Sequence, residues 1–342
     1  MDYIKKTIII ILGALSNLKR NKKAIDSCSL FLAPGYYKNT VSGDIVYNIK
    51  KQEHLKIKTY SSYKQNTKLA LFIVKIINSL CFYKVNDKKQ LYQGTELLIS
   101  SSGNEYKIFV FETQVLLTKY LDIAKMQTII NNKRLFGEFY NIPESKDYLG
   151  EHTIVIETLI NQKTFNAKDA FSYLNNQYLK FLKKQALHTN ICRERYEEER
   201  DYYASRFGES KLLAGDDVGI VRLLTHGDMW SSNVMYDSEK YYLTDFEHVG
   251  VRFFLFDFIY FIFSEWLFNG QSEMLLLYFN GYYDHLLNDI FELLSLNFEK
   301  DRKQEYFLTF LVSMTFERWK EDISMDKKIR SFTKEFLPTY YE

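Results

Sequence analysis

The chain has 342 residues, with 46% hydrophobic and 17% aromatic content and only 3 Pro and 14 Gly. This length suggests about two domains or lobes, and the composition supplies packed cores while arguing against long disordered linkers. A formal net charge of +2 provides no global field for nucleic acid, and the 3 Cys are scattered without C-x-x-C spacing. We therefore expect a protein of a reducing cytoplasm, with no disulfide framework and no zinc site.

The amino-terminal segment combines an apolar run with basic clusters on both sides. Ile4, Ile8, Ile11, Leu15 and Leu18 recur at helical spacing and form one stripe. The pattern predicts a helix docked on the body of the protein, and the alternative is a peripheral membrane contact through residues 1–23. The run imitates a signal peptide, but basic residues follow it instead of a small-x-small cleavage site. It is also shorter than the roughly 20 residues of a membrane span, so a cytoplasmic location is favoured.

The next segment predicts a mixture of strands and a helix. Residues 44–50 and 54–60 read as strands, and Asn66 and Thr67 cap an apolar helix over residues 68–80. The sequence assigns no role to this α+β segment.

From residue 95 the pattern is that of a small sheet. Residues 95–100 alternate as a strand, residues 101–104 form a turn, and residues 106–112 and 115–120 predict two further strands. A helix is expected over residues 122–135. The β-branched run at residues 153–160 predicts the strand that leads into the next lobe.

The rest of the chain predicts a mostly helical region. A long helix over residues 167–188 precedes a charge-dense helix over residues 193–206, whose residues 197–200 are expected to face solvent. The remaining expected elements are, in chain order, a strand at 220–224, a hairpin of 233–236 and 241–244, and apolar helices over 253–268, 274–287 and 304–321.

The most informative stretch reads THGDMWSSN at residues 225–233 and LTDFE at residues 243–247. Asp228 and Asn233 stand at D-x-x-x-x-N spacing, and Asp245 follows a short apolar run. A kinase needs such a base and two metal ligands, and protein kinases write them as H-R-D-x-x-x-x-N followed by D-F-G. The predicted hairpin brings Asp245 back beside Asn233. The two blocks together indicate a kinase-type site rather than separate surface turns.

These residues resemble the aminoglycoside phosphotransferase and choline/ethanolamine kinase superfamily, whose members write the catalytic loop as H-G-D or H-N-D. The D-F-E block, and Phe256-Asp257-Phe258 with Glu265-Trp266, are most similar to the choline-kinase branch. The resemblance implies an α+β, bilobal protein-kinase-like fold. A small antiparallel-sheet N-lobe at residues 94–160 and a larger helical C-lobe at residues 161–342 would follow an amino-terminal extension, residues 1–93.

The resemblance implies a role for each polar residue of the two blocks. Asp228 would be the catalytic base that accepts or orients the proton of the attacking hydroxyl. Asn233 and Asp245 would hold Mg²⁺ against the phosphates of ATP, since this cation prefers oxygen ligands. His226 would be a scaffold residue that bonds the loop backbone, and Asp257 a buried brace for the same loop.

The side of the site that would bind ATP is less defined. Lys119 is the best candidate for the phosphate-binding lysine, with Lys107 and Lys58 as alternatives. Ser101 and Gly103 lie in the turn expected to cover the phosphates. The acidic partner that the family places on the helix after the lysine is not evident. On the expected helix the polar residues at this place are Gln127, Asn131 and Asn132, and Glu138 follows the end of the helix.

The acceptor side offers two pairs of an acidic and an aromatic residue. Glu265 and Trp266 could bind a cationic head group, as such residues do in choline kinases, and a cation over an aromatic face contributes about 0.5–2 kcal/mol. Glu317 and Trp319 form the second pair. The alternative is that both Trp side chains pack in the core.

The sequence therefore predicts an ATP- and Mg²⁺-dependent kinase of a small-molecule hydroxyl, on an amino alcohol or on a sugar or glycan precursor. The alternative is a kinase-fold binding or regulatory protein without turnover, which the missing acidic partner favours and the intact Asp228, Asn233 and Asp245 oppose. A protein kinase is disfavoured because no A-P-E block follows Glu247. No patterned basic patch indicates nucleic-acid binding.

Overall fold

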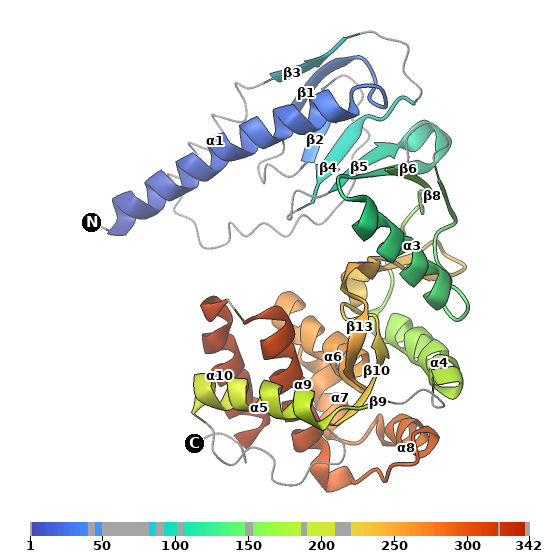
Figure 1. Cartoon of the computed structure of the whole chain (residues 1–342), viewed down its shortest axis with the longest axis vertical. Coiled ribbons are helices and arrows are strands. Elements are labelled where there is room, and N and C mark those ends of the chain that lie inside the picture. Colours follow the sequence, from blue (N-terminus) through green and yellow to red (C-terminus); the bar gives the residue numbers. More distant parts are fainter. Residues whose placement is uncertain are drawn as a thin grey trace. The chain divides into compact units, whose positions relative to one another are not determined.

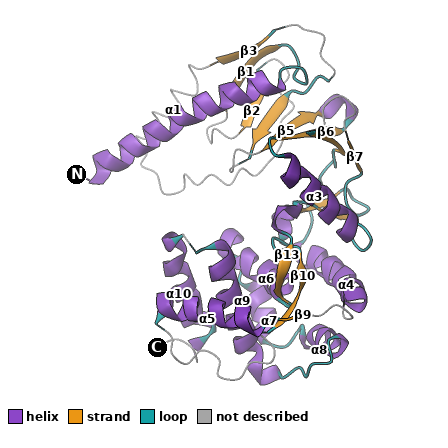
Figure 2. Cartoon of the chain, viewed as in Figure 1, coloured by secondary structure: helices purple, strands orange, loops and turns teal. Residues whose placement is uncertain are grey.

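The computed structural model describes residues 2–39, 45–49, 82–86, 92–100, 105–147, 153–185, 190–208, 220–320 and 322–338 (Figure 1). The chain divides into two compact units, one of residues 1–130 and 143–161 and the other of residues 131–142 and 162–342. The fold class is α+β, as expected: an antiparallel sheet dominates the first unit and helices dominate the second (Figure 2).

The first unit is built on an eight-stranded antiparallel sheet with the order β3-β1-β2-β4-β5-β6-β8-β7. The strands are β1 (Gly35–Asn39), β2 (Ile45–Asn48), β3 (Phe82–Val85), β4 (Glu96–Ile99), β5 (Glu105–Val110), β6 (Val115–Tyr120), β7 (Ser145–Asp147) and β8 (Ile154–Thr158). The strands predicted from residue 95 onward are confirmed as β4, β5, β6 and β8. The prediction for residues 106–112 overran by two residues, because the chain leaves β5 through a 3₁₀ turn that ends at Gln114 with a φ of 51°.

Strands from the amino-terminal ninety residues extend this same sheet. Ile45 of β2 pairs with Leu98 of β4, and β1 and β3 complete the edge. Strand β2 confirms the prediction at residues 44–50. Strands β1 and β3 were not predicted; both are short, and β3 pairs with β1 across about 45 intervening positions. The expected strand at residues 54–60 and the helix at 68–80 lie outside the described residues.

Helix α1 (Asp2–Cys28) confirms the predicted amino-terminal helix and packs on the sheet. Ile25 and Cys28 join a buried cluster with sheet residues such as Ile108 and Leu117. Leu15, a member of the predicted stripe, is 49% exposed. The buried positions of the helix include Ala14, Ala24 and Ile25 instead.

Among the described helices, none has the length and apolar character needed to cross a bilayer. Contact of residues 1–23 with a membrane surface stays a prediction, as does the cytoplasmic location.

The second unit contains the helical region and two small strand pairings. Its helices are α4 (Ala167–Gln185), α5 (Arg193–Phe207), α6 (Phe256–Asn269), α7 (Glu273–Phe279), α8 (Asp284–Leu293), α9 (Lys303–Arg318) and α10 (Asp326–Phe336). Strands β9 (Asn190–Ile191) and β13 (Gly250–Phe253) flank β10 (Val221–Thr225), and β11 (Val234–Tyr236) pairs with β12 (Tyr241–Leu243). Helix α3 (Ile123–Phe136) begins in the first unit and ends in the second.

Two predictions for the second unit were wrong. Residues 274–287 form two helices rather than one, because Gly281 takes a φ of 87° between α7 and α8 and breaks the helical hydrogen bonding. Glu199, expected in a solvated face of α5, is fully buried. Both of its carboxylate oxygens accept hydrogen bonds from Arg222 of β10, at 2.9 and 2.8 Å, and this pairing makes burial of the charge tolerable.

Candidate active site

The catalytic loop begins where β10 ends and turns sharply at Gly227. This glycine has a φ of 78°, and a Cβ at its position would lie 2.2 Å from the carbonyl oxygen of His248 and 2.5 Å from Nη1 of Arg252. Both the backbone conformation and the lack of space require glycine here. The H-G-D wording of the loop therefore has a local physical cause.

The carboxylate of Asp257 holds the backbone of this loop through two hydrogen bonds. It lies in the first turn of α6 with only 2% exposure. Its Oδ2 accepts the backbone N–H of His226 at 2.6 Å, and its Oδ1 accepts that of Gly227 at 2.8 Å. Burial raises the pKa of Asp257, while His226 and the two amides act in the opposite direction. These are the contacts expected of a brace.

His226 links the loop to the D-F-E segment. Its ring is fully buried, and Nε2 lies 3.0 Å from the carbonyl oxygen of Thr244, next to Asp245. Phe136 and Phe246 meet the ring edge to face. Burial lowers the pKa of His226 even though several carboxylates surround it. A neutral ring that donates to a carbonyl fits a scaffold role rather than proton transfer.

Asp228, the predicted base, is held by three side chains. Its Oδ1 accepts the hydroxyl of Tyr260 at 2.6 Å and Nη2 of Arg318 at 2.9 Å. Its Oδ2 accepts Nδ2 of Asn233 at 2.8 Å. The carboxylate is therefore fixed in orientation before any ligand arrives.

The charge state of Asp228 follows from these contacts. Burial by itself raises the pKa of this carboxyl, but the charge of Arg318 and the hydrogen bond from Tyr260 outweigh burial, so the pKa lies below its ordinary value. Asp228 is consequently ionised at neutral pH and able to accept a hydrogen bond from a hydroxyl.

Asn233 and Asp245 are brought together by the β11–β12 hairpin. The backbone N–H and the hydroxyl of Thr244 both donate to the carbonyl oxygen of Asn233 at 3.0 Å. Asp245 itself has a φ of 64°, an uncommon conformation for a non-glycine residue. The prediction that the hairpin returns Asp245 to the vicinity of Asn233 is confirmed.

The oxygens of these two residues fit a magnesium ion. Because Nδ2 of Asn233 donates to the backbone oxygen and to Oδ2 of Asp228, its Oδ1 faces the other way. Within the part of the chain that the structure describes, neither this Oδ1 nor the Asp245 carboxylate receives a hydrogen bond or an ion pair. One carboxylate and one amide oxygen of this kind match the hard oxygen ligands that Mg²⁺ prefers.

The residues predicted to bind ATP belong to the first unit. Lys119 lies near the end of β6, and its Nζ donates to the carbonyl oxygen of Ser27 at 3.2 Å. Lys107 of β5 pairs with Glu105 at 3.2 Å. Ser101, Gly103 and Lys58 lie outside the described residues. The nucleotide-binding roles stay predictions.

Two of the residues considered as the missing acidic partner have other contacts. Asn132 of α3 donates through Nδ2 to the carbonyl oxygen of Phe246 at 3.1 Å, so the end of this helix contacts the D-F-E segment. Glu138 forms an ion pair with Lys184.

The structure does not bring Glu265 and Trp266 together as an acid–aromatic pair. Glu265 is 2% exposed, and its Oε2 accepts Nδ2 of Asn269 at 2.8 Å. Trp266, one residue further round α6, packs against Phe332 and Phe336 of α10. Successive helical residues point about 100° apart, which explains the separation.

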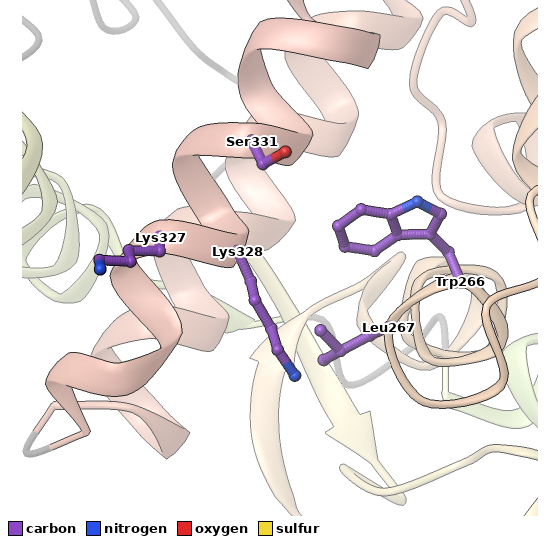
Figure 3. A pocket seen from close by; sticks show the side chains of 5 residues that line it. All are labelled: Trp266, Leu267, Lys327, Lys328 and Ser331. Carbon is purple, nitrogen blue, oxygen red and sulfur yellow. The ribbon is translucent and has the colours of Figure 1, made fainter. Parts of the chain in front are cut away.

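Trp266 lines a pocket of about 320 Å³ together with Leu267, Lys327, Lys328 and Ser331. Figure 3 shows the indole beside α10, with Ser331 on the side of that helix nearer to it, Lys328 extending toward Leu267 and Lys327 pointing away from the indole. The polar lining of this pocket is basic rather than acidic.

Two residues that hold the base were not predicted. Tyr260 and Arg318 stand 32 and 90 positions after Asp228. The spacing of Tyr260 from Asp257, about one helical turn, could have placed it on the loop-facing side of α6. Arg318 carried no local signal, because only the packing of α9 brings it to the loop.

The match of the chain to a family model places it among the small-molecule kinases. The chain belongs to the ecdysteroid kinase-like family, whose model matches residues 124–296. This range contains the catalytic loop, the D-F-E segment and α6. No curated protein sequence matches the chain.

The solved structures to which the chain is similar include aminoglycoside phosphotransferases and choline or ethanolamine kinases. The choline kinase LicA from Streptococcus pneumoniae is 15% identical over 72% of this chain and 99% of its own, with a TM-score of 0.36. An aminoglycoside phosphotransferase from Streptomyces rimosus is 10% identical over 63% and 91%, with a TM-score of 0.36. A Plasmodium vivax ethanolamine kinase is 13% identical over 63% and 73%, with a TM-score of 0.34.

Proposed function

We propose that this chain transfers the γ-phosphate of ATP to a hydroxyl of a small molecule. The observation that carries the proposal is the fixed, ionised carboxylate of Asp228 together with the side-chain oxygens of Asn233 and Asp245, which receive no hydrogen bond from the residues that the structure describes. Membership of the ecdysteroid kinase-like family supports the same reaction class.

In the proposed reaction, Asp228 orients the acceptor hydroxyl and takes its proton. The acceptor oxygen forms a bond to the γ-phosphorus as the bond from that phosphorus to the bridging oxygen breaks and ADP leaves. Mg²⁺ held by Asn233 and Asp245 would neutralise phosphate charge. Such a loose transition state depends more on positioning than on strong basicity, which suits a carboxylate whose pKa is low.

The proposed acceptor is a hydroxyl of an amino alcohol, a sugar or a glycan precursor, and the name of the family adds steroid alcohols to the compounds worth testing. Lys119, Ser101 and Gly103 are the proposed contacts with ATP. The reaction is detected as acceptor-dependent ADP release by the purified protein in the presence of Mg²⁺.

Substitution of the base tests the assignment. Asp228→Asn should reduce acceptor phosphorylation by at least about 100-fold, the low end for general-base catalysis, while ATP binding changes only a few-fold. Asp201→Asn is the matched control, because Asp201 lies exposed on α5 and, among the described residues, its ion pair is with its neighbour Arg200. Near-wild-type turnover by the Asp228 variant would refute its role.

Substitution of Asn233 and Asp245 tests the proposed binding of Mg²⁺ and ATP. Wild-type protein should gain about 2.7 kcal/mol of stability at a hundred-fold excess of Mg-ATP over Kd. Asp245→Ala should lose this gain and Asn233→Ala should lose part of it, because the carboxylate carries the charge. A thermal-shift titration in which the Asp245 variant responds like wild type would contradict the metal assignment.

A further inference from the structure

One of the residues that hold the base stands at the very end of a helix. Arg318 is the last residue of α9, and its Nη1 donates to the carbonyl oxygen of Gly227 while its Nη2 donates to Oδ1 of Asp228, both at 2.9 Å. The last carbonyl oxygens of an α-helix lack intrahelical partners, so the final turn frays unless other contacts fix it. The orientation of Asp228 therefore depends on what holds the last turn of α9.

The neighbouring residue, Glu317, fixes this turn through two ion pairs. Its Oε1 accepts Nη2 of Arg195 from α5 at 2.8 Å, and its Oε2 lies 3.3 Å from Nη2 of Arg252 on β13. The guanidinium of Arg195 also lies over the ring of Phe316, at 4.4 Å from the ring centroid. Two arginines from different elements thus hold one carboxylate in the final turn of α9.

The surroundings of Glu317 distinguish these ion pairs from ordinary surface pairs. The Glu317 side chain is 18% exposed and that of Arg252 is 8% exposed, so water screens their charges only in part. Arg195 is more exposed, but a hydrogen bond to the buried Glu199 at 3.2 Å orients it. Ion pairs stabilise a structure measurably when several charges form a network with fixed geometry. This group of side chains meets that condition.

Arg252 connects the same carboxylate to the start of the catalytic loop. Its Nη1 donates to Oγ1 of Thr225 at 3.2 Å and would lie 2.5 Å from a Cβ at Gly227. The guanidinium therefore lies directly against the turn that precedes Asp228. One carboxylate thus ties the last turn of α9 to the backbone that leads to the base.

We propose that Glu317 is a positioning residue for phosphotransfer, because its two ion pairs keep Arg318 in contact with Asp228. Successive helical residues point about 100° apart, so Glu317 reaches α5 and β13 while Arg318 reaches the catalytic loop. The inference rests on the proposed phosphotransferase function. It gives the charge-dense helix α5 a part in the reaction, exerted through the end of α9.

A double-mutant cycle on kcat separates positioning from general stability. Glu317→Gln removes the charge and keeps the size of the side chain, and Arg318→Gln removes the contact with the base. Because members of one network are coupled, Glu317→Gln should lower kcat about ten-fold when Arg318 is present. When Arg318 is already replaced, the same change should lower kcat less than about two-fold. Acceptor-dependent ADP release at saturating Mg-ATP gives kcat, and the KM for Mg-ATP should stay within a few-fold throughout.

Two further variants control for the effects of lost charge and of misfolding. Glu198→Gln removes an exposed carboxylate that also pairs with Arg195, at 3.3 Å, and should leave kcat unchanged. Arg195→Gln weakens the hold on Glu317 from the exposed side and should lower kcat about three-fold, but only when the arginine of α9 is present. Glu199 keeps its two hydrogen bonds from Arg222 in this variant. Arg195→Gln therefore replaces Glu317→Gln in the cycle if the latter does not fold.

The cycle distinguishes the possible failures. A purely structural role would lower kcat by the same factor in both backgrounds, in proportion to the folded fraction, and this result overturns the inference. An unchanged kcat in Glu317→Gln, or in Arg318→Gln, overturns it as well while leaving the phosphotransferase function supported. Absence of acceptor-dependent ADP release by the wild-type protein with every amino alcohol, sugar and steroid alcohol refutes the proposed function itself, and the inference with it.

Discussion

Replacement of Gly227 by alanine isolates the steric demand of the catalytic loop. Gly227 and Gly270 have similar backbone conformations, with φ values of 78° and 68°, but they differ in the space around a Cβ. At Gly227 a Cβ would meet the carbonyl oxygen of His248 at 2.2 Å, whereas at Gly270 nothing lies within 4 Å. Gly270→Ala is therefore a matched control for the backbone conformation alone.

The expected losses of folding free energy follow from the backbone conformation and from the space around the Cβ. An alanine in the left-handed region costs about 1–2 kcal/mol at either position. Overpacking against a backbone oxygen adds about 1–3 kcal/mol at Gly227. Since a change of 1 kcal/mol shifts Tm by about 2–4 °C in a unit of this size, Gly227→Ala should melt several degrees below Gly270→Ala.

Thermal unfolding followed by circular dichroism measures the difference, and acceptor-dependent ADP release measures its effect on the loop. Gly227→Ala should lose most activity because Asp228 follows directly, while Gly270→Ala should retain it. If Gly227→Ala is no less stable than Gly270→Ala, the close approach of His248 does not constrain the loop and the reasoning fails.

Three further predictions concern buried charges. Asp257→Asn replaces one acceptor by a donor facing a backbone N–H and should cost about 1–3 kcal/mol; an unchanged urea midpoint would contradict the brace. Glu199→Gln leaves Arg222 buried without its partner and should destabilise by about 3–5 kcal/mol, whereas a loss below about 1 kcal/mol would show that the pair is dispensable. Because burial lowers the pKa of His226, the unfolded chain binds a proton first as pH falls below about 6.5, and stability should drop by up to about 1.4 kcal/mol per pH unit. Urea unfolding at pH 5.5 and 7.5 checks this, and His226→Gln should flatten the dependence; an equally steep dependence in that variant would assign it to other groups.

The chemistry of the loop could be predicted because it is written in contiguous residues. Asp228, Asn233 and Asp245 stand close in the sequence, and the hairpin that joins them has a local turn signal. The same holds for Asp257, whose place in the first turn of an apolar helix already indicated a buried, hydrogen-bonded carboxylate.

The sequence by itself indicated the superfamily, the α+β class and the strands from residue 95 onward, and it predicted the residues of a kinase-type site, since each depends on periodicity or on spacing within a few residues. Only the tertiary structure decided what surrounds Asp228. Packing of α9 sets Arg318 against the base, helix geometry turns Glu265 away from Trp266, and the pairing of α5 with β10 buries Glu199. These contacts join residues from 23 to 90 positions apart or depend on which face of a helix is covered. Long-range packing chooses among many sterically possible neighbours, and no local pattern of residues encodes that choice.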